Sequence, residues 1–217
     1  SNMVWYGPNS GMGMYYSEGS MVNGAEVMEP RTAADYILGI YVPLLQQQVG
    51  RGDVEWTTDL PELAQATYTD AINTIQGGGS AYQWDADAAK VRLSYDIEGW
   101  GIEQDIVAST MYCYDPMNDI MVWRVMSLNS CGAAAGELDS KSQLFATIIA
   151  SFREDPAWHA AVMDVVNALV ARQAQQVPSQ VSSYAGTPSS YAGICTDSWE
   201  SRSEVHDHAA ASFSDAI

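Results

Sequence analysis

Carboxylates gather on one face of a β-hairpin that the sequence predicts for residues 91–98 and 102–111. A two-residue turn that begins at Gly99 places Asp96 directly opposite Glu103. Like charges at opposed positions of a sheet repel each other unless a cation or a basic side chain lies between them. We therefore expect these two carboxylates to hold a cation such as calcium, to meet a basic partner, or to be solvated.

The same hairpin offers a surface for a protein partner. Glu98 and Asp105 flank the opposed pair, and Trp100 lies at the hairpin tip. We expect these three side chains to contact a partner that complements the acidic charge of the chain. A face that is only solvated is the simpler interpretation, and it is the one we favour for the carboxylates themselves.

Paired carboxylates are also the acid and the base of many glycoside hydrolases. In such enzymes the pair lies in a cleft that shifts its pKa values, whereas an open hairpin face predicts no cleft. The sequence has no GxSxG motif and no phosphate-binding glycine loop, and Cys195 precedes His206 by about three helical turns. We therefore rank an acidic secreted hydrolase below a binding function, and we expect no cofactor.

Three side chains share one face of a helix that the sequence predicts for residues 196–217. Glu200, Glu204 and His208 are four residues apart, so zinc or nickel could bind between them. A solvated acidic face is the alternative that we favour.

A second stripe of this helix carries Trp199, His206 and Phe213. We expect this stripe to be a contact surface, because aromatic side chains recur along it at steps of three and four residues. It could pack on its own domain or on a second copy of the chain, which would give a dimer.

Asp85 and Asp87 match only the first positions of a calcium-binding loop, since Lys90 stands where that loop requires glycine. We expect both aspartates to cap a helix or to stabilise a turn. Looser ligation of a metal by their oxygens is the alternative.

The composition limits the partners of the chain. Its 217 residues include 27 acidic and 9 basic side chains, for a formal net charge of −18. Nucleic acid is a poor partner for such a charge, because phosphate binding requires cations. No apolar run approaches the roughly 20 residues of a membrane helix. Cys113 and Cys131 are predicted too far apart along a hairpin for a cross-strand disulfide, while Cys195 could reach either of them.

Hydrophobic periodicity predicts an α+β fold. Alternation predicts three consecutive antiparallel strands, at residues 91–98, 102–111 and 120–128, after possible edge strands within residues 3–29. Helices are predicted to begin at Thr32, at Thr58 or Asp59, at Asp139 or Ser140, and after Pro156. Pro43 predicts a kink or an early end in the first of them.

Three parts follow from this pattern: a domain over residues 3–174, a linker over 175–195 and the helix over 196–217. The linker is rich in Ser, Gly and Pro and holds two copies of SSYAG. The helical pattern still runs at Ile217, so we expect the chain to be part of a longer protein.

The order of elements resembles a known type of sandwich. The strands VRLSYDIEG, IEQDIVAS and MVWRVMSL are followed by GELDSKSQLFATIIASFREDPAW, whose FATIIASF is typical of a closing helix. Over residues 29–158 this order resembles uncharacterised bacterial proteins of the PsbP-like α/β-sandwich type, often extracytoplasmic or lipid-anchored. The resemblance implies a mainly antiparallel sheet covered by helices, and a binding or assembly role without a shared active site. We therefore expect a non-enzymatic interaction or assembly module that works outside the cytoplasm.

Overall fold

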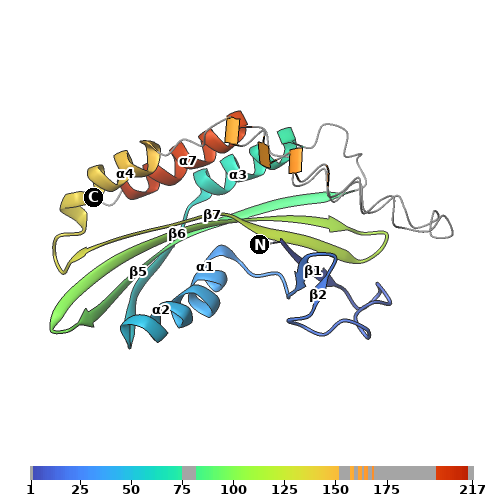
Figure 1. Ribbon diagram of the computed structural model, residues 1–217, viewed down its shortest axis with the longest axis horizontal. Helices are drawn as coiled ribbons and strands as arrows, with labels where there is room; N and C mark the ends of the chain where they lie inside the picture. The colour runs from blue at the N-terminus through green and yellow to red at the C-terminus, as the bar shows by residue number, and fades with distance from the viewer. Residues whose placement is uncertain are drawn as a thin grey trace.

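One seven-stranded sheet organises the chain in the computed structural model, which describes residues 2–74, 82–151 and 199–214, with 157, 158, 161, 162, 164, 165 and 168 between them. The strand order is β2-β3-β1-β7-β6-β5-β4. All pairs are antiparallel except β1 with β3. Helices cover both faces of the sheet, as Figure 1 shows. These features confirm the predicted α+β class with a mainly antiparallel sheet.

The elements have the following bounds. The strands are β1 (Asn2–Tyr6), β2 (Met21–Val22), β3 (Ala25–Val27), β4 (Gly52–Asp59), β5 (Gln83–Ile97), β6 (Trp100–Asp115) and β7 (Ile120–Ala134). The helices are α1 (Ala33–Tyr36), the π-helical turn η1 (Ile37–Tyr41), α2 (Val42–Val49), α3 (Pro61–Thr74), the 3-10 turn η2 (Asp139–Lys141), α4 (Ser142–Ser151) and α7 (Trp199–Ser214). The predicted linker 175–195 lies outside the described residues, as does most of the helix predicted after Pro156.

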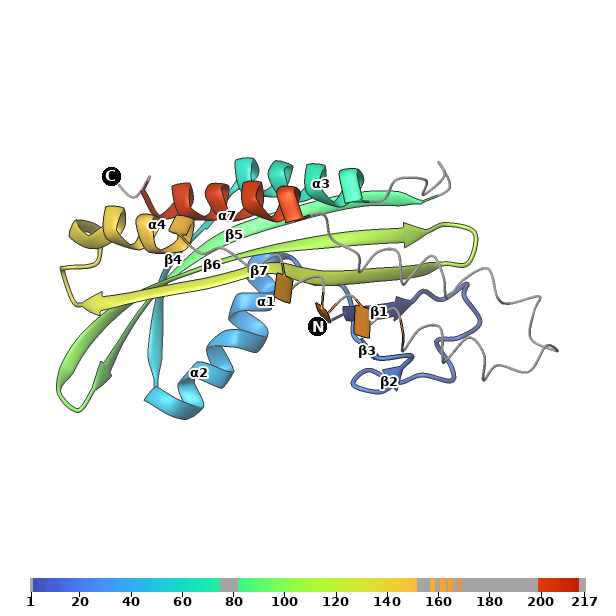
Figure 2. The ribbon, with the colours of Figure 1, turned by 45° about the horizontal axis from the view of Figure 1, so that its top comes forward.

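Strands β5, β6 and β7 form the centre of the sheet and confirm the three predicted strands. Each is longer than predicted, although β5 ends at Ile97, one residue before its predicted end. Successive side chains of a strand point to opposite faces. Val91 and Leu93 are buried under α1 and α2, together with Ile106 of β6. Lys90 and Arg92 point to the other face, which α3, α4 and α7 cover (Figure 2).

The turn between β5 and β6 lies one residue earlier than the sequence predicts. Glu98 and Gly99 form it, with φ of 54° and 86°, and Ile97 pairs with Trp100. Two central residues with positive φ define a type I′ turn, whose twist matches that of the flanking strands. The whole register therefore moves by two residues, which keeps every side chain on its predicted face but changes its partner.

Replacing Glu98 by asparagine is expected to raise the free energy of unfolding by about 0.5–1 kcal/mol. The left-handed conformation costs most residues roughly 1–2 kcal/mol, while asparagine adopts it at less cost. Denaturant unfolding measures the change, and Glu98→Gln is the matched control that removes only the charge. Equal stabilisation by both substitutions would assign the gain to charge instead of backbone conformation.

Residues that precede and follow Pro43 form one continuous helical segment against the sheet. The Thr32 side chain caps α1 by accepting a hydrogen bond from the Asp35 N–H. Asp87 of β5 accepts a second bond, 2.7 Å long, from the Ala33 N–H, which confirms its predicted role as a helix cap. Proline removes a donor and crowds the preceding turn. The π-helical turn η1 accommodates the proline, because the Val42 N–H donates a hydrogen bond to the Ile37 carbonyl there. The helix therefore neither ends nor breaks at Pro43.

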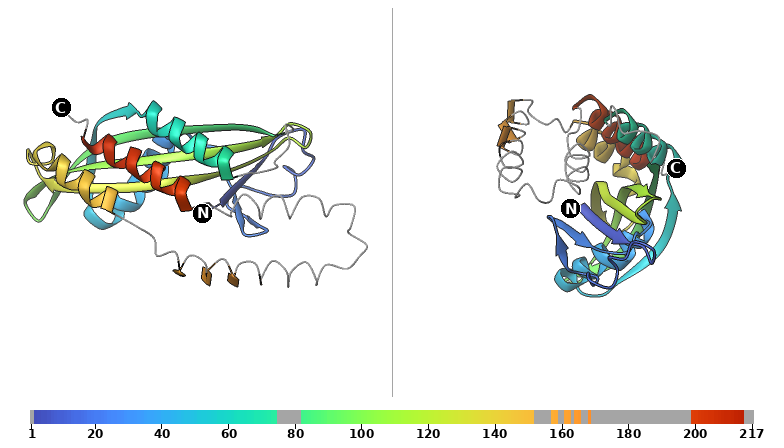
Figure 3. Two further views of the ribbon diagram at one scale, coloured as in Figure 1. Left: turned by 90° about the horizontal axis from the view of Figure 1, so that it is seen from above. Right: turned by 90° about the vertical axis from the view of Figure 1, so that its right-hand side faces the viewer.

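The other face of the sheet carries a layer of three helices, α3, α7 and α4 (Figures 2 and 3). All three contribute to one core with the sheet, through Leu63 of α3, Ile149 of α4 and Phe213 of α7. Thr58 and Asp59 belong to strand β4 and the helix α3 begins at Pro61, so the predicted start is two or three residues too early.

Candidate functional site

A cluster of four charged side chains, Lys90, Arg92, Asp105 and Asp139, lies between the sheet and the helix layer. We call it the Asp105 cluster. Arg92 donates two hydrogen bonds to the Asp105 carboxylate, of 2.7 and 3.0 Å, and Lys90 Nζ lies 3.0 Å from the same carboxylate. Lys90, Arg92 and Asp105 are each less than 9% exposed. Asp139 also accepts a bond of 2.6 Å from Arg92, and this bond lowers the pKa of Asp139.

Aromatic rings and a helix carbonyl complete the surroundings of the two cations. The guanidinium carbon of Arg92 lies 4.9 Å from the centre of the Trp56 ring. Lys90 Nζ lies 5.4 Å from the Phe213 ring centre and donates a hydrogen bond of 3.1 Å to the Ser212 carbonyl. Cations are attracted to ring faces at such distances. The cluster therefore joins β4, β5, β6, η2 and α7.

The Asp105 cluster is suited to hold structure together. Its two cations and two carboxylates balance in charge, and each buried group has partners on the protein. The prediction that Asp105 lies on an exposed acidic face is wrong, because Arg92 is its direct cross-strand neighbour. As a buried group it is also unsuited to the partner contact that the sequence predicts for it.

The tip of the β5–β6 hairpin, residues 96–101, has the opposite character, and we call it the Trp100 tip. Pairing of β4 with β5 stops at Tyr95, and pairing of β7 with β6 stops at Ile102. The tip therefore projects beyond both neighbouring strands (Figure 1). Trp100 is 73% exposed, and its cross-strand partner Ile97 is 41% exposed.

Carboxylates lie close to this apolar pair along the hairpin, but Asp96 and Glu103 point to the opposite face of the strands. Asp96 and Glu98 are exposed, and Glu103 is half-buried beside them. Asp96 accepts a hydrogen bond of 2.7 Å from the Gly99 N–H, which braces the turn. The predicted opposition of Asp96 and Glu103 is wrong: Asp96 pairs with Gly101, and Glu103 pairs with Ser94. The calcium hypothesis thus stays a prediction, without the opposed pair that motivated it.

Metal ligation by the C-terminal helix also stays a prediction. The side chains of Trp199, Glu200, Glu204 and His206 lie outside the described part of the structure. Among the side chains that are described, no three of His, Cys, Asp and Glu come together as metal ligands would. Phe213, by contrast, is 2% exposed and packs inside its own chain. At that end the predicted aromatic stripe makes an intramolecular contact.

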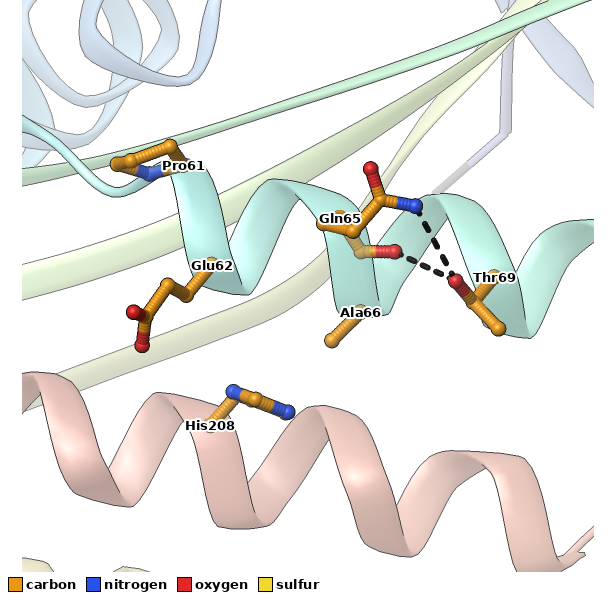
Figure 4. A pocket seen from close by; sticks show the side chains of 6 residues that line it. All are labelled: Pro61, Glu62, Gln65, Ala66, Thr69 and His208. Atoms are coloured by element: carbon orange, nitrogen blue, oxygen red, sulfur yellow. Dashed lines mark hydrogen bonds between the residues drawn. The ribbon is translucent and has the colours of Figure 1, made fainter.

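A shallow pocket of about 420 Å³ lies between α3 and α7, away from the tip of the β5–β6 hairpin (Figure 2). It is lined by Pro61, Glu62, Gln65, Ala66, Thr69 and His208. Figure 4 shows the Glu62 carboxylate and the His208 imidazole pointing into the space between the two helices. Within α3, the Gln65 side-chain amide donates a hydrogen bond to the Thr69 hydroxyl, and that hydroxyl donates one to the Gln65 backbone carbonyl. His208 is thus placed beside Glu62, a neighbour that the sequence analysis did not foresee.

The two described cysteines are free thiols. Cys113 pairs with Val122 and Cys131 with Asp105, so the prediction that they form no cross-strand disulfide is confirmed. Burial raises the pKa of Cys113 to about 12 and also raises that of Cys131. Neither thiol is activated as a nucleophile, since reactivity requires the thiolate. Cys195 lies outside the described residues.

No helix in the described residues is both long enough and apolar enough to cross a membrane. Comparisons of this chain with models of known protein families, with curated proteins and with solved structures find no match.

Proposed function

We propose that this chain is a non-enzymatic interaction module that binds a basic, partly apolar protein segment at the Trp100 tip. The observation that carries the proposal is the exposure of Trp100, at 73%, on a hairpin end that projects beyond its neighbours. Tryptophan is one of the residue types enriched among side chains that dominate binding energy. An exposed tryptophan paired with an exposed isoleucine is therefore a candidate anchor for a partner.

The charges around the tip select the kind of partner. Asp96, Glu98 and Glu103 lie within a few residues of the apolar pair, in the turn and on the opposite face of the hairpin, and the whole chain carries a formal net charge of −18. Such a field attracts basic molecules, accelerates their association and repels acidic ones. The partner segment should therefore combine lysine or arginine with an apolar side chain that packs on the indole ring of Trp100.

The backbone of the tip favours binding because it is already ordered. A type I′ turn closes the hairpin, and the Asp96 carboxylate fixes the turn through the Gly99 N–H. Binding to an ordered surface loses less conformational entropy than binding to a flexible loop. The tip is thus able to present Trp100 without a costly rearrangement.

A role in interaction or assembly agrees with the resemblance to PsbP-like sandwiches, and we include that assignment in the proposal. The layered arrangement of one mainly antiparallel sheet with helices on both faces supports it. The same resemblance supports a location outside the cytoplasm. Fractionation of the producing cells, with detection of this chain, tests the location.

Selection from a random peptide library on the wild-type protein tests the binding function. We expect the selected peptides to be basic with at least one large apolar residue, and Trp100→Ala to weaken their binding at least about tenfold. Added salt should weaken binding as well, because exposed charges are screened. Trp158→Ala is the matched control, since Trp158 is also exposed, at 59%, but lies elsewhere. Peptides without basic residues, or equal binding by Trp100→Ala, would contradict the proposal.

A further inference from the structure

Within the described part of the chain, strand β7 is paired on one side only along its second half. It pairs with β6 from Ile120 to Ala134, whereas β1 covers only Ile120 to Arg124 on the other side. Within the described residues, no strand pairs with residues 125–134 along this edge. Ten residues of extended strand span roughly 33 Å. Backbone donors and acceptors along such an edge can pair with an added strand.

Apart from a bulge at Met126, where Ser109 pairs with Ser127 and Thr110 pairs with Val125, this edge lacks the features that protect the other edges of the sheet. Residues 125–134, VMSLNSCGAA, contain no charged residue and no proline. The edge strand β4 carries Asp53, Glu55 and Asp59 and has a bulge between Val54 and Trp56. The edge strand β2 has only two residues. Charges, bulges and short length are the usual means by which proteins prevent pairing at edges. Among the described parts of these three strands, the stretch of β7 after Met126 is the edge left open to pairing.

The helix beside this edge also exposes apolar side chains. Figures 2 and 3 place α4 on the β7 side of the helix layer and α3 on the β5 side. Leu144 and Ile148 of α4 are each 55% exposed, although Ala146 and Ile149 on its inner face are buried. On the opposite face of the sheet, Leu128 of β7 is 38% exposed. The open edge is therefore flanked by apolar surface as well as being uncharged.

We propose that residues 125–134 of β7 pair with the same strand of a second copy, so that two sheets join across a two-fold axis. A two-fold contact requires one surface to complement itself. An uncharged antiparallel strand does so, because its backbone pairs with itself and no like charges meet. Two chains of net charge −18 repel each other over most of their surfaces, and this repulsion is least where both surfaces are neutral. The same charge makes a basic partner better suited to the Trp100 tip than to this edge.

Sedimentation analysis over a range of protein concentrations tests the dimer. We expect the wild-type protein to dimerise, and Ser130→Lys to weaken the dimer at least about tenfold by placing like charges close to the two-fold axis. Ser130 is exposed on β7, and Leu144→Lys on α4 is a second variant that leaves the strand intact. Thr57→Lys, on the exposed edge strand β4, is the matched control and should dimerise as the wild type does.

Hydrogen exchange locates the contact. The amides of residues 125–134 should exchange more slowly at high than at low protein concentration, in the wild type but not in Ser130→Lys. A wild-type protein that stays monomeric overturns the proposal, and protected amides in such a monomer would show that the edge is covered by the chain's own residues. Dimerisation that both lysine variants leave unchanged also overturns it. These outcomes do not depend on Trp100, so they are separate from the test of the binding function.

Discussion

Replacing Asp105 by asparagine is expected to lower the free energy of unfolding by about 3–5 kcal/mol. Removal of one partner from a buried ion pair leaves the other charge without compensation, and this is the typical cost. Here two cations, Lys90 and Arg92, both rely on the Asp105 carboxylate. The remaining carboxylate, Asp139, contacts Arg92 but is 56% exposed and cannot replace a buried anion between the two.

Denaturant unfolding followed by circular dichroism measures this loss. The matched control is Glu103→Gln, a substitution on the same strand and the same face, two residues away, where the cross-strand neighbour is Ser94. We expect that control to stay within about 0.5 kcal/mol of the wild type. A similar small effect for Asp105→Asn would show that the Asp105 cluster is solvated, contrary to the structure.

Replacing Phe213 by alanine is expected to destabilise the protein by about 3–5 kcal/mol, because truncation of a buried phenylalanine removes apolar contacts and leaves a cavity. Phe213 is 2% exposed, packs in the core shared by α3, α4 and the sheet, and lies against the Lys90 ammonium. Thermal or denaturant unfolding gives the magnitude. Hydrogen exchange should show the amides of α7 losing protection first, since this helix loses its anchor.

Leu144→Ala is the control for the helix layer, because Leu144 is 55% exposed and its truncation should cost little. If Phe213→Ala were equally mild, α7 would not be an integral part of the domain. The C-terminal stripe would then regain its alternative role as a surface for another chain.

Periodicity was sufficient to predict the long strands and their buried faces. Val91, Leu93 and Ile106 alternate with polar residues, and the structure buries all three. Alternation depends on side-chain type alone, so it can be recognised without knowledge of neighbouring elements. Strand β4 was not predicted, although Val54 and Trp56 alternate with acidic and threonine residues. The contact of the Trp56 ring with Arg92 was therefore not predicted either.

The register of the hairpin could not be derived with equal success. Glycine at the first turn position favours a turn that begins at Gly99, whereas the chain places Glu98 in a left-handed conformation and lets Asp96 brace the turn. A shift of two residues keeps the faces but replaces each cross-strand partner. Asp105 thereby faces Arg92, so a carboxylate predicted at the surface becomes the centre of a buried cluster.

The burial of this cluster depends on α7, which is more than 90 residues away from Asp105 along the chain. A single sequence contains no local signal for such a contact. A stripe of aromatic residues predicts that a helix packs on something, but it does not identify the surface on which it packs. The same limit applies to His208 and Glu62, which two distant helices bring together at one pocket.

Mapping of amide and indole chemical shifts, while a selected basic peptide is added to the isotope-labelled protein, tests the central claim most directly. The account predicts that the largest changes occur in residues 96–103, including the indole N–H of Trp100, and that they vanish in Trp100→Ala. Changes centred instead on Glu62, Gln65, Ala66 and His208, which line the pocket between α3 and α7, would contradict it.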